Sequence, residues 1–368
     1  MRFPGFTDEW KKITLGEIAD VTKLAGYEFT KYVIYEDEGE IIALRGLNCK
    51  SGQLVLDDVK YIDHSDLSKL TRSKLYIGDI LFTYVGTVGE VAIIDKNDKY
   101  YLAPNVSRIR LRPGNCEGFV MQQLSSKKFY NSIVFPLIAT SSQPALSMEN
   151  VRKFVISIPS IKEQNKIAQL LSIIDERIAT QNKIIDNLQS LIKGLAKELT
   201  QQGEPNTRIS DCLECHTSTL QESNLQESGK YPVYGASGVA GHLDEYVCDK
   251  DSILIIKDGS GVGTVSRVSG KYSVIGTLNY LTAKPGYSLI YLYFCLRSFN
   301  FNLFKTGMAI PHIYFKDYER AKIWCPTLES QNDIAKILSA IEEKLQIESG
   351  ILDSLHRKKS YLLNNMFI

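Results

Sequence analysis

Two long stretches of the chain place apolar residues at alternating spacings of three and four, the pattern of a helix with one apolar stripe. In the first stretch the seam positions are Leu171, Ile174, Ile178, Gln181, Ile185, Leu188, Ile192, Leu195 and Leu199. In the second they are Leu338, Ile341, Leu345, Glu348, Leu352, Leu355, Lys359, Leu362 and Met366. The pattern predicts two long amphipathic helices that carry a few polar residues, Gln181 and Glu348 among them, inside the seam.

These two stretches also repeat each other in sequence. Residues 163–178 read EQNKIAQLLSIIDERI and residues 330–345 read SQNDIAKILSAIEEKL, with eight of sixteen positions identical at an offset of 167. Pro159 and Pro326 share that offset and precede the two copies, where proline suits the first turn of a helix. An offset of this size predicts a domain-plus-helix unit that occurs twice.

Each helix spans some 40 residues, or ~60 Å at ~1.5 Å per residue, which is long for a helix inside a globular core. One interpretation is that each stripe is the buried face of an ordinary bundle helix. The other is that the two helices pair with each other as an antiparallel coiled coil, because the chain offers no other long partner. An antiparallel pair of repeated helices implies an approximate two-fold axis.

The remaining segments, 1–158 and 204–325, have the character of strands. Apolar, β-branched runs such as GDILFTYVGTVGEVAII and DSILIIKDGSGVGTVSRV are separated by Gly, Asp and Asn turns, with one helix expected in each segment, near 118–135 and near 289–298. We therefore predict an α+β chain with two mixed domains, 1–158 and 204–325, each followed by a helical segment, 159–203 and 326–368.

Bulk composition excludes little. With 44% hydrophobic residues the chain can build real cores, and its formal net charge of +1 argues against general attraction to nucleic acid but not against a local basic face. Seven scattered cysteines fit a reducing compartment, and neither a secretory signal nor a long apolar run is present. These features predict a cytoplasmic protein without a membrane span.

One short motif, CLECH, places Cys212, Cys215 and His216 in the spacing used for haem attachment. A zinc site would need two further ligands, and no second such pair follows. The alternative is a chance pattern at the edge of a strand or loop.

Two glycine-rich turns, at 86–89 and 259–263, resemble phosphate-binding loops but lack the lysine and the following helix that such loops need. A tight hairpin or bulge is the better interpretation. Glu342, Glu343 and Lys344 fit a solvated helix face, and no nucleophile–base arrangement can be argued. The sequence thus predicts a chain without a catalytic site.

Taken in order, several motifs resemble one family. RFPGFTDEWKKITLGEIADV, GDILFTYVGTVGEVAII, YPVYGASGVAGHLDEY and ILIIKDGSGVGTV, with IPSIKEQNKIAQLLSIID and CPTLESQNDIAKILSAIE, resemble the specificity subunit of bacterial type I restriction-modification enzymes over essentially the whole chain. Ser330 departs mildly from this pattern, in which glutamate is usual.

The resemblance implies a non-catalytic subunit with two target recognition domains, each reading one half of a bipartite double-stranded DNA target. The two helices would form a spacer and would dock two methyltransferase subunits, which carry S-adenosylmethionine. Motor-nuclease subunits would add ATP and magnesium, so that this chain itself would hold no cofactor. A coiled-coil adaptor for proteins, or a haem or metal protein using the CLECH motif, remain the alternatives.

Within such domains, polar and aromatic side chains at turns between strands are the candidates for reading base edges and phosphates. In the first domain these are Arg45, Tyr84, Thr87, Ser141, Ser142 and Gln143. In the second domain they are Lys257, Asp258, Ser260, His312, Tyr314 and Lys316. The sequence of the DNA target itself does not follow from these residues.

Overall fold

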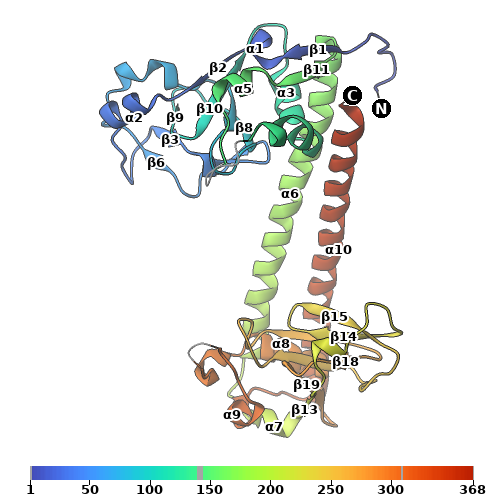
Figure 1. The fold of residues 1–368 in the computed structure, drawn as a ribbon. Coiled ribbons are helices and arrows are strands. Elements are labelled where there is room, and N and C mark those ends of the chain that lie inside the picture. The colour runs from blue at the N-terminus through green and yellow to red at the C-terminus, as the bar shows by residue number, and fades with distance from the viewer. Residues whose placement is uncertain (1, 139–143, 308–309, 368) are drawn as a thin grey trace. The chain divides into compact units, whose positions relative to one another are not determined.

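The computed structural model describes residues 2–138, 144–307 and 310–367, and the chain divides into two compact units (Figure 1). Unit 1 comprises Met1–Thr180 and Leu352–Ile368, and unit 2 comprises Gln181–Ile351. Both long helices are therefore shared, because each unit contains one half of each helix. The fold class is α+β, as the sequence predicted.

The main sheet of unit 1 is antiparallel and has the order β2-β10-β7-β8. Its strands are β2 (Ala19–Lys23), β10 (Val106–Leu111), β7 (Ile80–Thr83) and β8 (Val91–Ile93). Outside it, β1 (Lys11–Thr14) pairs with β11 (Val155–Ile158) and so joins the beginning of the unit to the strand that precedes the first long helix.

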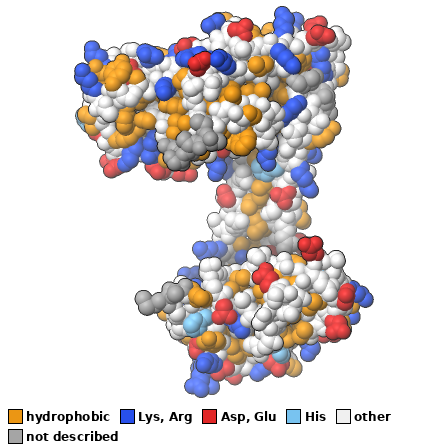
Figure 2. Space-filling view, in the orientation of Figure 1, with side chains coloured by type: hydrophobic (Ala, Val, Ile, Leu, Met, Phe, Trp, Pro, Cys, Tyr) orange, Lys and Arg blue, Asp and Glu red, His pale blue; other side chains and the backbone are white. Residues whose placement is uncertain are grey.

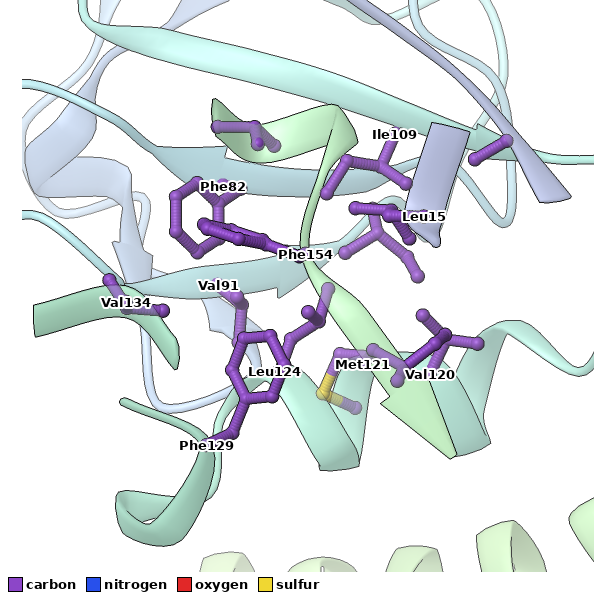
Figure 3. Close-up of a cluster of buried hydrophobic side chains, with 14 of the residues drawn as sticks. Leu15, Phe82, Val91, Ile109, Val120, Met121, Leu124, Phe129, Val134 and Phe154 are labelled. Atoms are coloured by element: carbon purple, nitrogen blue, oxygen red, sulfur yellow. The ribbon is translucent and has the colours of Figure 1, made fainter. Parts of the chain in front are cut away.

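Phenylalanines dominate the core between this sheet and the short helices α1 (Leu15–Ile18), α3 (Glu117–Leu124) and α5 (Met148–Arg152). Figure 3 shows Phe82 and Phe154 side by side, with ring centroids 5.5 Å apart, and Phe129 below them. The Phe129 ring meets Phe154 edge-on at 5.5 Å, a favourable geometry for two aromatic rings.

A second, smaller sheet in unit 1 has the order β6-β3-β9, with β3 parallel to β9. Its strands are β3 (Ile42–Leu44), β6 (Lys60–Tyr61) and β9 (Tyr100–Leu102). Around it lie α2 (Gly26–Tyr32), the pair β4 (Cys49–Lys50) and β5 (Gln53–Leu54), and the 3-10 turns η1 (Gly46–Asn48), η2 (Leu67–Lys69) and η3 (Thr71–Ser73).

The single helix expected near 118–135 is wrong, because the chain breaks after α3. Ser126 has an extended backbone, and its hydroxyl accepts a hydrogen bond of 3.1 Å from the Phe129 N–H. A serine in this role starts a new helix rather than continuing an old one. Short turns follow: α4 (Lys127–Phe129), the π-turn η4 (Tyr130–Val134) and the 3-10 turn η5 (Phe135–Leu137).

Unit 2 repeats both sheets with the same strand orders, β13-β19-β16-β17 and β15-β14-β18. The first contains β13 (Leu213–Thr217), β19 (Leu278–Ala283), β16 (Ser252–Ile256) and β17 (Val265–Val268). The second contains β14 (Tyr231–Gly235), β15 (Gly238–Leu243) and β18 (Ser273–Val274), with β14 parallel to β18. The pair β12 (Thr207–Arg208) and β20 (Lys322–Ile323) corresponds to β1 and β11.

Helices and turns of unit 2 follow the same plan. They are α7 (Ile209–Cys212), η6 (Glu222–Asn224), α8 (Leu289–Arg297), η7 (Phe301–Phe304) and α9 (Phe315–Tyr318). The helix expected near 289–298 is therefore present as α8. Because strand order and pairing direction agree in both sheets, the internal repeat extends from the helices to the two sheets of each unit.

The two long helices are α6 (Ile161–Thr200) and α10 (Leu328–Met366). In unit 1 the beginning of α6 packs against the end of α10, through Ile167 and Leu171 with Met366. In unit 2 the end of α6 packs against the beginning of α10, through Ile192 and Ala196 with Leu338. These contacts define an antiparallel pair.

Every seam position of both helices is buried or half-buried. Several large apolar residues of the same helices outside the seam are exposed, among them Ile173, Leu191, Ile337, Ile347, Ile351 and Tyr361. The helices therefore carry a second set of apolar side chains on their outer faces.

Gln181 and Glu348, the equivalent polar positions of the repeat, contact each other inside unit 2. The Gln181 Nε2 donates to the Glu348 carboxylate at 2.5 Å and to the Glu348 carbonyl at 3.0 Å. Equivalent residues of two repeated helices meet when the pair is antiparallel and in this register. A polar pair of this kind disfavours other registers, in which each partner would face apolar side chains.

Two buried glutamines of the repeated motif tie each long helix to its domain. The Gln164 Nε2 donates to the Pro159 carbonyl at 2.9 Å, while its Oε1 accepts from the Cys116 N–H at 2.9 Å. Gln331 makes the same two bonds, to the Pro326 carbonyl and from the Ser288 N–H, both at 2.9 Å. Both glutamines thus link the helix start to the residue that precedes α3 or α8.

An acidic residue at a second repeated position anchors the same helices. Asp175 accepts from the Gln122 amide at 2.6 Å and pairs with Lys359 at 2.6 Å in unit 1. Glu342, its equivalent in unit 2, accepts from the Tyr293 hydroxyl at 2.8 Å and from Arg297 at 2.7 Å. The prediction of a solvated face is therefore wrong for Glu342, whose side chain is only 16% exposed.

The mild departure at Ser330 also has a structural counterpart. Glu163, the equivalent residue of the first copy, is buried and forms a two-point ion pair with Arg2, at 2.7 and 3.0 Å. Ser330 instead lies 3.0 Å from the Thr327 hydroxyl, at the start of its own helix. The glutamate of the first copy therefore holds the N-terminal segment of the chain, and the serine of the second copy makes a local contact.

Candidate nucleic-acid interface

The glycine-rich turn of unit 1 is a hairpin that connects β7 to β8, as the sequence favoured. Gly86 and Gly89 have backbone φ angles of +81° and +97°, which L side chains rarely adopt. The Gly89 N–H donates to the Thr83 carbonyl at 3.0 Å, and a Cβ at Gly89 would lie 2.7 Å from the ring of Tyr130. Glycine is therefore needed here both for the turn and for the close approach of η4.

The segment that begins at Pro144 binds this hairpin through its backbone. The Gly86 N–H donates to the Pro144 carbonyl at 3.0 Å, and the Leu146 N–H donates to the Tyr84 carbonyl at 2.8 Å. The Leu146 side chain is buried in the core, so the segment is held by side-chain packing as well as by the two backbone hydrogen bonds. We call the hairpin together with this segment the reading frame of unit 1. The term here means a structural support, formed by residues 84–90 and 144–147.

Unit 2 has the same construction, which we call the reading frame of unit 2, residues 257–264 and 311–314. The Gly259 N–H donates to the Pro311 carbonyl at 3.0 Å, and the Ile313 N–H donates to the Lys257 carbonyl at 2.9 Å. Ile313 is buried, as Leu146 is in unit 1. The repeat therefore places a hairpin and a proline segment together in each unit, although they are far apart in the sequence.

All the candidate residues of unit 2 lie in this frame or beside it. Asp258 pairs with His312 as an isolated β-bridge, so the hairpin and the proline segment bring these two side chains together. The His312 and Tyr314 rings are 5.1 Å apart, and the Lys316 ammonium lies 5.3 Å from the Tyr314 ring. Lys257 and the exposed Ser260 complete a group that joins cations, a carboxylate, a hydroxyl and an imidazole.

In unit 1 the candidate residues lie in different environments. Thr87 is exposed at the tip of the hairpin, as expected. Tyr84 follows directly after β7, but it is 8% exposed and packs in the core, and its carbonyl and N–H are both bonded to neighbouring segments. Burial raises the pKa of its hydroxyl. Ser141, Ser142 and Gln143 lie outside the described residues.

Arg45 lies in a different segment, at the start of η1. The adjacent Gly46 is close to the hairpin, since a Cβ there would lie 3.7 Å from the Thr83 methyl group. The Arg45 guanidinium is already engaged, with the Asp58 carboxylate at 2.6 Å and the Asp58 carbonyl at 2.9 Å. Contact with DNA would therefore require this ion pair to open.

One cation beside the frame of unit 1 was missed by the sequence analysis. The Lys23 ammonium, from the end of β2, lies 5.1 Å from the centroid of the Tyr84 ring. The signal was present in the sequence as a lysine at the end of an amphipathic strand, but its closeness to residue 84 depends on the pairing of β2 with β10.

The residues of the CLECH motif lie in different environments: Cys212 is buried in the core, whereas Cys215 and His216 lie on β13. The Cys212 thiol donates to the Ile209 carbonyl at 3.4 Å inside the core, and its pKa is raised by the neighbouring Cys325 and by burial. Burial also raises the pKa of Cys215 to about 11. His216 stacks on Tyr280 at 4.8 Å. Over the described part of the chain, no three His, Cys, Asp or Glu side chains gather closely enough to hold a metal ion.

Charged side chains of both signs occur on both units in the view of Figure 2. On the face shown in Figure 2, Lys and Arg side chains alternate with acidic and neutral ones and do not merge into one large basic surface. None of the described helices is long and apolar enough to cross a membrane.

Comparison with known proteins gives a consistent picture. The family described as type I restriction modification DNA specificity domain matches residues 7–190 and again residues 206–357. A Methanocaldococcus jannaschii protein named as the MjaX type I restriction enzyme specificity subunit is 22% identical over 346 residues, covering 83% of this chain and 81% of its own. The EcoKI specificity subunit of Escherichia coli is 24% identical over 163 residues, 42% of this chain and 35% of its own.

Two solved structures share the fold. The S subunit of a type I restriction-modification system from M. genitalium superimposes with a TM-score of 0.70 at 18% identity, covering 100% of this chain and 97% of its own. A chain from a study of complex assembly and conformational transition of the type I R-M system gives a TM-score of 0.58 at 16% identity, with 98% of both chains covered.

Proposed function

Because the chain belongs to the type I restriction modification DNA specificity family, we propose that its two reading frames each read one half of a bipartite DNA target. The chain is the specificity subunit of such a system and has no catalytic role of its own. We therefore prefer this function to the two alternatives that the sequence left open, a coiled-coil adaptor and a haem or metal protein.

The repeated frame is the observation that supports this proposal. Each unit holds a glycine hairpin and a proline segment by the same backbone bonds, from Gly86 to Pro144 and from Gly259 to Pro311. The backbone of each frame is thereby fixed, while its outward side chains can vary. Amides, hydroxyls and cations on such a rigid support match the donor and acceptor pattern of base edges and phosphates.

The partners would bind along the paired helices. Apolar side chains are exposed on α6 and α10, such as Ile173 in unit 1 and Ile337 in unit 2. Burial of such side chains against a partner protein is favourable. In unit 2, a groove of about 510 Å³ on the paired helices is lined in part by Lys193, Lys197 and Arg297. We propose that two methyltransferase subunits dock here and carry S-adenosylmethionine, and that motor-nuclease subunits bring ATP and magnesium.

Methylome sequencing of cells that express this chain with its methyltransferase subunit tests the proposal. A methylated motif split into two short halves around unread base pairs is expected. Two half-sites on one side of B-DNA would lie about one helical turn, or ~10 bp, apart. A single contiguous motif, or no sequence preference, would contradict the proposal.

The spacer role of the helices has its own test. Gly194 lies on an exposed face of α6, and a Cβ there would meet nothing within 4 Å. Four seam-compatible residues inserted near Gly194, matched by four in the facing part of α10, lengthen the pair by ~6 Å, close to two base-pair steps. The unread spacer should widen by one or two base pairs with both half-sites unchanged.

A further inference from the structure

The two main sheets can be superimposed residue by residue through their registers. Lys23 of β2 pairs with Ser107, which pairs with Phe82, and Thr217 of β13 pairs with Asn279, which pairs with Ile255. Lys23 and Thr217 therefore occupy equivalent positions.

The same alignment identifies the first residue after each central strand. Thr83 and Ile256 end β7 and β16, and they pair with Val106 and Leu278 at equivalent points of the neighbouring strand. Tyr84 is consequently the equivalent of Lys257. At the first of these positions unit 1 has Lys23 and unit 2 has Thr217. At the second, unit 1 has Tyr84 and unit 2 has Lys257.

A lysine nevertheless lies beside the hairpin in both units. In unit 2 it is Lys257, whose N–H donates to the Thr277 carbonyl at 2.9 Å and whose carbonyl accepts from Ile313. In unit 1 it is Lys23, whose exposed ammonium lies over the Tyr84 ring at 5.1 Å. Since Tyr84 is fixed by the core and by backbone bonds to Asn105 and Leu146, its ring is a rigid platform that favours a cation in this place.

Across the described residues, neither lysine takes part in an ion pair. The ion pairs of unit 1 occupy other cations, such as Lys74 with Asp98 and Arg110 with Asp79, and those of unit 2 occupy cations such as Arg297 with Glu342. An unpaired ammonium beside a rigid reading surface suits a phosphate oxygen, which positions a protein on DNA without reading its sequence.

We propose that Lys23 is a DNA-phosphate contact of unit 1, the functional counterpart of Lys257, and that Tyr84 is the positioning residue that holds it. The proposal rests on the DNA-reading function of the frames. The repeat thus keeps one cation beside each hairpin but supplies it from β2 in unit 1 and from the hairpin itself in unit 2.

The test is the salt dependence of DNA binding, measured by fluorescence anisotropy on the full-length chain in complex with its methyltransferase subunits. The probes are a duplex that carries the mapped target and a scrambled duplex of equal length. Lys23→Ala and Lys257→Ala should each lower the slope of log K against log salt by about 0.9 in magnitude, and should weaken both duplexes alike. Lys31→Ala is the matched control, because the Lys31 ammonium lies 5.4 Å from the Tyr32 ring on α2 and should leave the slope unchanged.

Variants of Tyr84 separate a positioning role from a merely structural one. Tyr84→Phe keeps the ring and should retain the wild-type slope, whereas Tyr84→Leu should reproduce the loss seen in Lys23→Ala. The double variant Lys23→Thr with Tyr84→Lys transplants the arrangement of unit 2 into unit 1 and should restore the slope. Thermal melting of every variant identifies any loss of folding, and Lys23→Ala, which changes an exposed side chain, remains decisive if the Tyr84 variants unfold.

The outcomes are distinguishable. If Lys257→Ala lowers the slope and Lys23→Ala does not, or if the folded double variant does not restore it, the equivalence of the two lysines is wrong while the proposed function stands. If the wild-type complex binds the target and scrambled duplexes equally, the DNA-reading function itself is wrong.

Discussion

The reading frames of units 1 and 2 share a backbone and differ in side chains. Equivalent backbone bonds join Gly86 to Pro144 and Gly259 to Pro311, yet the neighbouring side chains are Ala145 in one unit and His312 in the other. Bonds from main-chain groups do not depend on side-chain identity, so the frame survives when its surface residues change. The comparison teaches that this fold separates a fixed backbone support from the side chains that the support presents.

The supports differ in one instructive detail. In unit 1 the buried Thr83 hydroxyl accepts from the Glu90 N–H at 2.9 Å and helps to close the hairpin. In unit 2 the equivalent Ile256 has no hydroxyl, and the loop is one residue longer because of Gly261. The two hairpins thus reach the same pairing with the proline segment by different internal contacts.

The largest expected effect concerns the two helix-start glutamines. Gln164→Leu and Gln331→Leu should each lower the free energy of unfolding by about 2 kcal/mol, because each removes two hydrogen bonds of a buried glutamine and leaves a partly buried N–H and carbonyl unpaired. Chemical denaturation measures this, with the exposed Gln189→Leu on α6 as the control, which should change stability by no more than about 0.5 kcal/mol. Markedly unequal losses would break the equivalence of the two units at this position.

Glycine substitutions sharpen the comparison within one hairpin. Gly89→Ala should lower the free energy of unfolding by about 2 kcal/mol, because the new Cβ meets the Tyr130 ring at 2.7 Å in addition to the backbone strain. Gly86→Ala should cost about 1 kcal/mol, since its Cβ would meet nothing within 4 Å and only the positive φ is unfavourable. Thermal melting of both variants measures these losses of stability. Equal losses in the two variants would show that η4 is not packed on the hairpin.

A smaller effect of opposite sign is expected in the helix seam. Replacing both Gln181 and Glu348 by Leu should raise the free energy of unfolding by about 1 kcal/mol, because two desolvated polar groups become packed apolar ones. Gln181→Leu alone should destabilise, since it removes the 2.5 Å hydrogen bond to the Glu348 carboxylate and puts an apolar side chain beside that charge. A double variant less stable than wild type would contradict the placement of this pair in the seam.

Periodicity explains what the sequence could predict. The three-and-four spacing predicted α6 and α10 and their seam, because burial along a helix depends on local spacing alone. The strand-rich domains and the hairpins also followed from local turn chemistry at Gly86 and Gly259. Repetition of the motif at a fixed offset added the pairing of the helices.

Long-range contacts explain what could not be predicted. The burial of Tyr84 depends on Asn105 and Leu146, which reach it from other parts of the chain. The roles of Gln164 and Gln331 depend on acceptor and donor groups in the domain, at Cys116 and Ser288. The break at Ser126 was local but ambiguous, because serine occurs both inside helices and at their first position.

The central claim is that each frame reads its own half of a split target, and comparison of methylomes tests it most directly. Cells would express the methyltransferase subunit with the wild-type chain, with Thr87→Ala, or with Ser260→Ala and His312→Ala together. We expect the Thr87 variant to relax the motif in one half and the unit 2 variant to relax it in the other half, with the spacer unchanged, since each good base contact contributes about 1–3 kcal/mol of discrimination. Relaxation of the same half by both variants, or of neither, would contradict the account.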